Sequence, residues 1–272
     1  MSVYLLIDNG SKKSEATLSL RELAVQLSAK SGKHVHAVSL QHADAVDKSL
    51  LNNIPAEIFS GFLRQQLEQG KRDFIVIPLF FGVSRALTSF IPAQVTELQN
   101  EFGPFNVKVA EVIYPLPAKE HRLAAILFDH IQTIINQKSS QIKNIVLVDH
   151  GSPVPQITEV RKQVSITLQS LLGTDVKLGQ AVMERREGSE YDFNGDLLED
   201  WLKVHAENGV KNIIVAMLFF LPGRHAGECG DIQQICDCVM AQYPNTEISI
   251  TPLIGEHESL ITILQDRLLA AE

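Results

Sequence analysis

Residues 67–81 read LEQGKRDFIVIPLFF, and residues 206–220, which lie 139 positions further along the 272-residue chain, read AENGVKNIIVAMLFF. Each stretch runs from a helix-like segment through a glycine into an apolar run that ends in two phenylalanines. A continuous apolar run, without the polar alternation of a half-exposed strand, is typical of a parallel strand that is covered on both faces. Because the stretch occurs twice, it predicts an internal duplication of an α/β unit.

The same order of strands and helices surrounds both stretches. In the first half we expect strands at 3–7, 34–40, 74–81 and 107–113, and helices near 15–30, 55–70, 90–101 and 119–136. In the second half we expect strands at 145–148, 175–182, 212–220 and 248–253, and helices near 156–172, 195–208, 231–242 and 257–271. This alternation predicts an α/β fold of two similar doubly wound lobes, each with a four-stranded, mainly parallel sheet flanked by helices. The polar stretch 136–144 is the expected join, so the lobes should span residues 1–138 and 139–272.

The composition narrows the class of protein. Hydrophobic residues make up 45% of the chain, as in a globular protein. The formal net charge of −8 argues against general nucleic-acid binding, which needs a basic face. The N-terminal residues lack the pattern of a signal peptide, and no apolar run approaches the ~18 residues of a membrane span. We therefore expect a cytoplasmic protein with neither a membrane nor a nucleic acid as partner.

The cysteines Cys229, Cys236 and Cys238 lie close together in the sequence. Three cysteines do not make a disulfide framework, and their spacing, C-x6-C-x-C, does not match the common iron–sulfur runs. We expect reduced, buried thiols, and the pattern assigns them no further role.

The segments that follow the first and third strands of each lobe should carry the chemistry, since ligands of such sheets bind beyond the carboxyl ends of the strands. The first strands are followed by DNGS (8–11) and DHGS (149–152), and the third strands by FFGVSRAL (80–87) and FFLPGRHA (219–226). The alignment sets Asn9 opposite His150 and Ala86 opposite His225. Both histidines are therefore present only in the second half, which predicts one site in a frame that occurs twice.

A pair of histidines at neighbouring loops suits a metal or a proton. Neutral imidazole binds Fe²⁺, Co²⁺, Ni²⁺ and Zn²⁺, and its ordinary pKa near 6.5 allows proton transfer. Glu228, three residues after His225, is a candidate third ligand, although a carboxylate there could instead stabilise the dipole of the next helix. Because a structural zinc site has about four protein ligands, this set predicts an open, fairly weak site. A single histidine after a strand is more often a loop residue, and the pairing favours function.

Three segments resemble the class II, ATP-independent tetrapyrrole chelatases: LVDHGS at 147–152, MERREGSEYDFNG at 183–195 and FFLPGRHAGECGDI at 219–232. The chain is similar in particular to the sirohydrochlorin cobaltochelatases and ferrochelatases in their two-domain form. The resemblance implies a lyase that inserts Co²⁺ or Fe²⁺, with Ni²⁺ as a further candidate, into sirohydrochlorin in sirohaem or cobalamin biosynthesis. The two active-site histidines of the family map onto His150 and His225. In other two-domain members they lie in the first half, where this chain has Asn9 and Ala86.

The resemblance also implies roles for individual residues. The expected catalytic and metal-binding residues are His150, His225 and Glu228. The expected substrate-binding residues are Arg185, Arg186, Arg224, Ser152 and Gly223, with the arginines gripping substrate carboxylates. Arg185 and Arg186 could instead form surface ion pairs within residues 184–187, and Arg224 could be architectural, because Arg85 occupies the matching position of the first half.

The expected ligands are the divalent metal, as a substrate, and the tetrapyrrole, bound in a cleft between the lobes, with no organic cofactor. The oligomer should be a monomer or a homodimer. A non-catalytic carrier of tetrapyrrole or metal is the alternative, since it would use the same cleft. A periplasmic binding protein also has two α/β lobes, but the absent signal peptide and the asymmetric histidines count against it.

Overall fold

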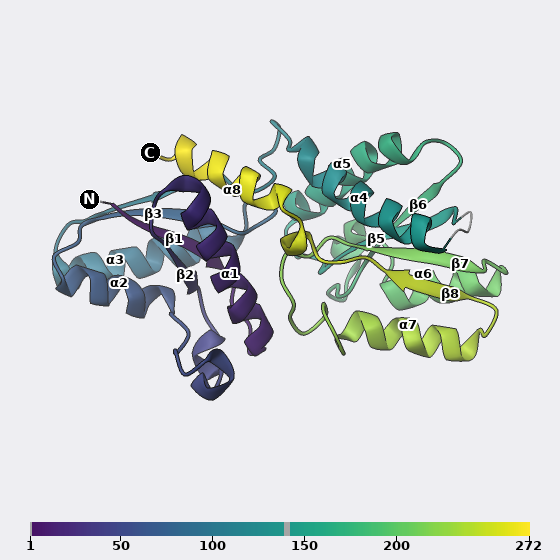
Figure 1. Cartoon of the computed structure of the whole chain (residues 1–272), viewed down its shortest axis with the longest axis horizontal. Helices are drawn as coiled ribbons and strands as arrows, with labels where there is room; N and C mark the ends of the chain where they lie inside the picture. Colours follow the sequence, from purple (N-terminus) through teal and green to yellow (C-terminus); the bar gives the residue numbers. More distant parts are fainter. Residues whose placement is uncertain (1, 139–141) are drawn as a thin grey trace. The chain divides into compact units, whose positions relative to one another are not determined.

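The computed structural model describes residues 2–138 and 142–272 of the chain. They form two compact units, one made of the residues up to Ala118 together with Glu258–Glu272, the other of Lys119–His257. The main elements of the first unit are β1 (Val3–Asp8), α1 (Ser14–Ser31), β2 (Val35–Ser39), α2 (Phe59–Glu68), β3 (Asp73–Pro78), α3 (Ile91–Phe102), β4 (Asn106–Val109) and α8 (Ser259–Ala270). Those of the second are α4 (His121–Lys138), β5 (Asn144–Asp149), α5 (Pro155–Leu172), β6 (Lys177–Val182), α6 (Leu198–Glu207), β7 (Asn212–Met217), α7 (Asp231–Gln242) and β8 (Glu247–Ile250) (Figure 1).

Each unit contains one four-stranded, all-parallel sheet. The strand orders are β2-β1-β3-β4 and β6-β5-β7-β8, so the two sheets have the same topology. In both, the first strand of the repeat lies between the second and the third. The prediction of two doubly wound α/β lobes is confirmed, and the loops after β1 and β3, or after β5 and β7, leave the sheet at neighbouring positions.

Helices cover both faces of each sheet, as the unbroken apolar strands require. In the second unit α4 packs against α5 on one face, and α6 packs against α7 on the other (Figure 1). The core between the sheet and the second pair contains Val146, Val215, Trp201, Leu202 and Cys236. The first unit has the equivalent arrangement, with α8 beside α1 and α2 beside α3.

The last helix of each repeat belongs to the compact unit of the other repeat. Helix α4, which we expected in the lobe 1–138, contacts α5 and β7 of the second unit, and α8, expected in the lobe 139–272, contacts α1 and β3 of the first. The compact units therefore differ from the sequence repeats by an exchange of these helices. Periodicity shows that α4 and α8 each have an apolar face, but it does not show which sheet that face will cover.

The cysteines divide between core and surface. Cys236 is buried on the inner face of α7, and burial raises the pKa of its thiol to about 12. Cys229 and Cys238 are exposed, so the prediction that these thiols are buried is wrong for both. Helix α7 begins only at Asp231, which leaves Cys229 in the preceding loop, and Cys238 lies away from the face formed by Ile232, Cys236 and Val239.

None of the helices in the described parts of the chain is both long and apolar enough to span a membrane.

Candidate metal centre in the second unit

The loop after β5 carries the first histidine. His150 directly follows the strand, is exposed, and has its Nδ1 atom 3.1 Å from the carbonyl oxygen of Gly151. Gly151 has a φ of +87°, and a Cβ at this position would overlap the main-chain oxygen of Glu184. The glycine therefore allows the loop after β5 to pass directly against the loop after β6.

That close passage also positions a carboxylate. The Met183 amide donates to the Asp149 carbonyl at 3.0 Å, and the Glu184 amide donates to the His150 carbonyl at 2.9 Å. These two hydrogen bonds extend the β5–β6 pairing past the ends of the strands. The side chain of Glu184 is consequently held beside the ring of His150.

The loop after β7 carries the second histidine. His225 is only 7% exposed and lies against the start of α7, where the Ile232 amide donates to its carbonyl at 3.1 Å. The Nδ1 atom of His225 lies 2.8 Å from Oδ2 of Asp231, and its Nε2 atom lies 3.3 Å from Oε1 of Glu184. The two carboxylates thus lie beside opposite nitrogens of one imidazole.

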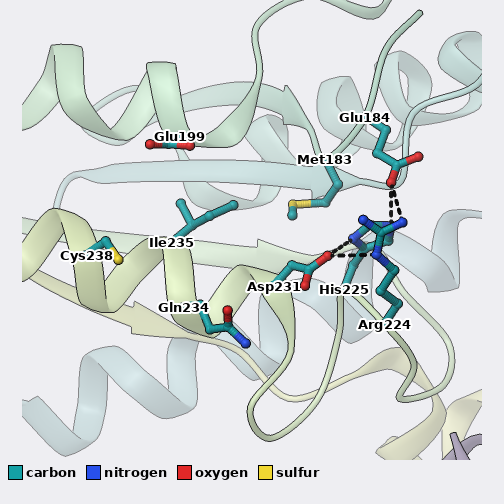
Figure 2. A pocket seen from close by; sticks show the side chains of 9 residues that line it. All are labelled: Met183, Glu184, Glu199, Arg224, His225, Asp231, Gln234, Ile235 and Cys238. Carbon is teal, nitrogen blue, oxygen red and sulfur yellow. Dashed lines mark ion pairs between the residues drawn. The ribbon is translucent and has the colours of Figure 1, made fainter.

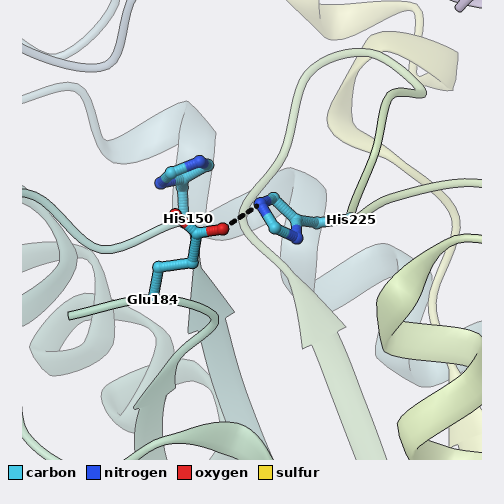
Figure 3. A group of neighbouring side chains, drawn as sticks. All are labelled: His150, Glu184 and His225. Atoms are coloured by element: carbon cyan, nitrogen blue, oxygen red, sulfur yellow. Dashed lines mark ion pairs between the residues drawn. The ribbon is translucent and has the colours of Figure 1, made fainter.

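The two histidines and the glutamate form one cluster. The ring centroids of His150 and His225 are 4.8 Å apart, with the rings nearly perpendicular. One ligand atom from each of His150, Glu184 and His225 lies within 4.8 Å of the others, and Figure 3 shows the three side chains converging from three loops. Two imidazole nitrogens and one carboxylate oxygen are suitable ligands for Fe²⁺, Co²⁺, Ni²⁺ or Zn²⁺. Three protein ligands leave further coordination positions open.

The surroundings favour the neutral form of His225. Burial lowers the pKa of His225 below its ordinary value, and the nearby His150 lowers it further, while Glu184 and Asp231 act in the opposite direction. A ring that is neutral near pH 7 keeps a lone pair available for a metal or a proton.

A pocket of about 450 Å³ opens beside His225 (Figure 2). It is lined by Met183, Glu184, Glu199, Arg224, His225, Asp231, Gln234, Ile235 and Cys238. The guanidinium of Arg224 is exposed and lies 3.2 Å from Glu184 and 3.3 Å from Asp231. Of the predicted substrate-binding residues, Arg224 is therefore brought next to the cluster.

Arg185 and Arg186 line a second hollow of about 420 Å³ together with Glu187, Gly188, Ser189, Asp192 and Leu197. Arg185 donates to the Gly195 carbonyl at 3.2 Å and lies 3.5 Å from Asp192. The guanidinium of Arg186 lies 5.8 Å from the centre of the Tyr191 ring. Both side chains are exposed, and the charged end of each remains accessible to a ligand.

The remaining predicted site residues are Ser152, Gly223 and Glu228, of which the first two make hydrogen bonds within their own loops. Ser152 accepts a hydrogen bond from the Val154 amide at its Oγ atom, just before α5 begins. The Gly223 amide donates to the Ala226 carbonyl at 2.8 Å and closes the turn that presents Arg224 and His225. Glu228 is exposed and is not one of the three residues of the cluster.

Glu184 and Asp231 are the residues near the two histidines that we did not predict as site residues. A signal for Glu184 was available, because it follows β6 by two residues and β6 pairs with β5. In the first unit the Gln41 amide donates to the Asn9 carbonyl at 3.3 Å, which makes Gln41 the structural counterpart of Glu184. The shift of 139 positions that relates residues 67–81 to 206–220 would instead set Gln41 opposite Gln180.

Comparison with known proteins gives a consistent result. A family model described as CbiX matches residues 3–134 and 144–271, one match for each repeat. A curated relative, the chloroplastic sirohydrochlorin ferrochelatase of Arabidopsis thaliana, is 21% identical over 177 residues, which cover 64% of this chain and 72% of that protein.

Solved structures share the fold over nearly the whole chain. SirB from Bacillus subtilis with Fe³⁺ has a TM-score of 0.70 at 13% identity, covering 99% of this chain and 95% of that one. The sirohydrochlorin chelatase SirB from Bacillus subtilis subspecies spizizenii in complex with cobalt has a TM-score of 0.68 at 14% identity, covering 99% and 94%.

Proposed function

Because the chain belongs to the CbiX family, we propose that it is an ATP-independent chelatase that inserts a divalent metal into sirohydrochlorin, on the route to sirohaem or cobalamin. The observation that carries this proposal is the convergence of His150, Glu184 and His225 in the second unit. Co²⁺ and Fe²⁺ are the proposed metals, with Ni²⁺ as a further candidate. Relatives named for sirohydrochlorin, and solved neighbours that hold iron or cobalt, support this substrate and these metals.

The proposed roles follow from the ligand set. A divalent metal bound by two imidazoles and one carboxylate keeps further coordination positions open. The nitrogens of the macrocycle can bind at these positions and then replace the protein ligands. Two pyrrole protons must leave as the metal enters, and the neutral ring of His225 can accept a proton or hold the metal. Glu184 takes the place as third ligand that we had expected for Glu228.

The carboxylates of sirohydrochlorin are the proposed partners of the arginines. Arg224 lies next to the cluster, and Arg185 and Arg186 line the second hollow of the same unit. The ion pairs that now engage Arg224 and Arg185 are exposed and contribute about 0–1 kcal/mol each. A substrate carboxylate can therefore replace them at little energetic cost.

The test is turnover. The purified chain is mixed with sirohydrochlorin and Co²⁺ or Fe²⁺, and the change in the absorbance of the macrocycle is compared with the spontaneous rate. We expect acceleration by the wild type and a loss of roughly 10²–10⁴-fold in His150→Ala and His225→Ala, the range typical of a positioned acid–base group.

The exposed histidine at the start of α4 offers a matched control, since His121→Ala removes an imidazole of the same unit without touching the cluster. This variant should keep the wild-type rate. Stoichiometric binding of sirohydrochlorin without acceleration would instead identify a carrier, and equal rates with and without the protein would refute the chelatase.

A further inference from the structure

A buried arginine lies directly behind the loop that carries His150. Arg161, on α5, is 2% exposed, and its Nη1 atom donates to Oδ1 of Asp149 at 2.6 Å. The same carboxylate oxygen accepts the Gly151 amide at 3.1 Å. The arginine thus holds the two residues that flank His150 through a single carboxylate.

The same guanidinium reaches a second loop. Its Nη2 atom donates to the main-chain carbonyl of Asn194, at the end of the 3₁₀ helix η4 (Ser189–Asn194). The side chain of Asn194, only 1% exposed, accepts the Ser152 amide at 3.1 Å and donates to the Ser152 carbonyl at 2.9 Å. Arg161 and Asn194 therefore join the loop at 149–152 to the segment that follows Arg185 and Arg186.

The first unit shows what the frame looks like without this network. Helices α1 and α5 both have 18 residues and begin 141 positions apart, which places Leu20 at the position of Arg161. Leu20 is buried, and it provides no charge for the carboxylate of Asp8. The buried Oδ1 atom of Asp8 has no hydrogen-bond partner among the described residues.

The first unit does anchor its second loop with an arginine, but one residue further along the helix. Arg21 donates to the main-chain carbonyls of Leu51, Ile54 and Pro55 at 3.1, 2.9 and 2.9 Å. Anchoring the loop therefore does not require an arginine at the position of Arg161. What distinguishes the second unit is the link from the guanidinium to the carboxylate beside the histidine.

We propose that Arg161 is a positioning residue of the metal centre. It holds the main chain on both sides of His150, and through Asn194 it couples this loop to the segment that follows Arg185 and Arg186. A buried ion pair is weak evidence for stability, because an apolar replacement of both partners is often neutral or stabilising. In the first unit Leu20 replaces only the arginine, and Asp8 stays buried without a charged partner at a place where no histidine has to be aimed. This inference rests on the proposed function, since it assigns Arg161 to the same site.

The experiment measures Co²⁺ binding by the visible absorption of the ion. In Asp149→Asn/Arg161→Leu both charges are removed together, so no uncompensated charge is buried. We expect a folded protein whose Kd for Co²⁺ is raised about 10–100-fold, the usual effect of removing a group that orients a ligand, and whose absorption bands are shifted. The single variant Arg161→Lys, which can still pair with Asp149, should recover part of the affinity.

Arg21→Leu is the matched control, because it removes the loop anchor of the first unit. It should lower the Tm while leaving the Kd and the spectrum of bound Co²⁺ unchanged. Should the double variant fail to fold, Asn194→Ala removes the hydrogen bonds of this side chain with Ser152, Thr158 and Tyr191 but keeps the main-chain carbonyl that Arg161 holds, and it should still raise the Kd several-fold.

A folded double variant with wild-type Kd and spectrum would overturn the positioning role, as would a Kd that Arg161→Lys does not improve at all. The result for His150→Ala separates the two proposals. If this variant loses Co²⁺ binding while the Arg161 variants keep it, only the inference fails. If His150→Ala and His225→Ala also keep wild-type binding, the metal centre itself is wrong.

Discussion

The loop after β1 and the loop after β5 share a main-chain frame but differ in chemical content. In both, a glycine with positive φ lets the loop pass directly against the loop of the neighbouring strand, and an amide of that strand's loop donates to the residue before the glycine. The residues at the three positions of the cluster are His150, Glu184 and His225 in the second unit. In the first unit the corresponding residues are Asn9, Gln41 and Ala86.

The comparison distinguishes the residues that the main-chain frame of the loop requires from the residues that the chemistry of the site requires. A single copy of the site would not show this distinction. The frame depends on main-chain hydrogen bonds and on the absence of a Cβ at Gly10 and Gly151, and it survives when the ligand side chains are gone. The chemistry depends on charged or ionisable side chains, all of which are replaced by neutral residues in the first unit.

The loops after β3 and β7 differ in backbone as well. After β3 the chain winds into the π-helical turn η3 (Ala86–Phe90), which continues into α3. After β7 it stays open until α7 begins at Asp231, with Gly227 at a φ of +101° and close to Pro222. Of the two loops, only the one after β7 carries a histidine. The carbonyl of this residue, His225, accepts a hydrogen bond from the Ile232 amide in the first turn of α7.

The largest effect that we expect concerns Asp149, the last residue of β5, whose counterpart at the end of β1 is Asp8. Asp149→Asn leaves the buried Arg161 without a counter-charge, which should destabilise the protein by about 3–5 kcal/mol in urea-induced unfolding at pH 7. Asp149→Asn/Arg161→Leu should regain most of this loss. A change of less than about 1 kcal/mol in the single variant would show that the pair is not coupled in the way described.

The equivalent substitution in the first unit, Asp8→Asn, should change the free energy of unfolding in the opposite direction. Burial raises the pKa of Asp8 to about 6, from an ordinary value of 3.8. The folded state therefore binds the proton more tightly than the unfolded state, and this contribution to stability is lost as pH rises from about 4 to about 6. Above that range the ionised Asp8 costs on the order of 2–3 kcal/mol.

Asp8→Asn should accordingly stabilise the protein at pH 7 and have little effect below pH 4. Free energies of unfolding for the variant and the wild type, measured from pH 4 to pH 8, test this expectation. Parallel curves would mean that Asp8 does not titrate as its burial predicts.

Smaller effects are expected from two separate variants, Glu184→Gln in the second unit and Gln41→Glu at the matching position of the first. Glu184→Gln keeps the size of the side chain but removes the anionic ligand, and should raise the Kd for Co²⁺ about 10-fold, or about 1.4 kcal/mol. Gln41→Glu places a carboxylate in the first unit, where Asn9 and Ala86 provide no imidazole, and should leave the stoichiometry of Co²⁺ binding unchanged. Isothermal titration of both variants checks the pair. A second bound ion in Gln41→Glu would contradict the view that the histidines define the site.

Much of the site could be predicted from the chain alone because it depends on local pattern. The apolar runs identified the parallel strands, and the carboxyl ends of adjacent strands in such a sheet are neighbours. Comparing the two repeats then singled out His150 and His225, and the structure places their rings 4.8 Å apart. Glu184 was missed because the shift of 139 positions that aligns the third strands does not apply here. Gln41 and Glu184 lie 143 positions apart, since the two repeats differ in length before this point.

By itself, the amino-acid sequence determined the strands, the helices, the duplication and the loss of the histidines from the first repeat, since each depends on residue type and spacing along one segment. The tertiary structure alone decided that α4 and α8 exchange units, that Glu184 joins the histidines, and that Arg161 pairs with Asp149. The apolar face of a helix can pack on any sheet that offers a matching apolar face. A buried charge can likewise pair with any opposite charge within reach. The partner is chosen only when the whole chain is packed.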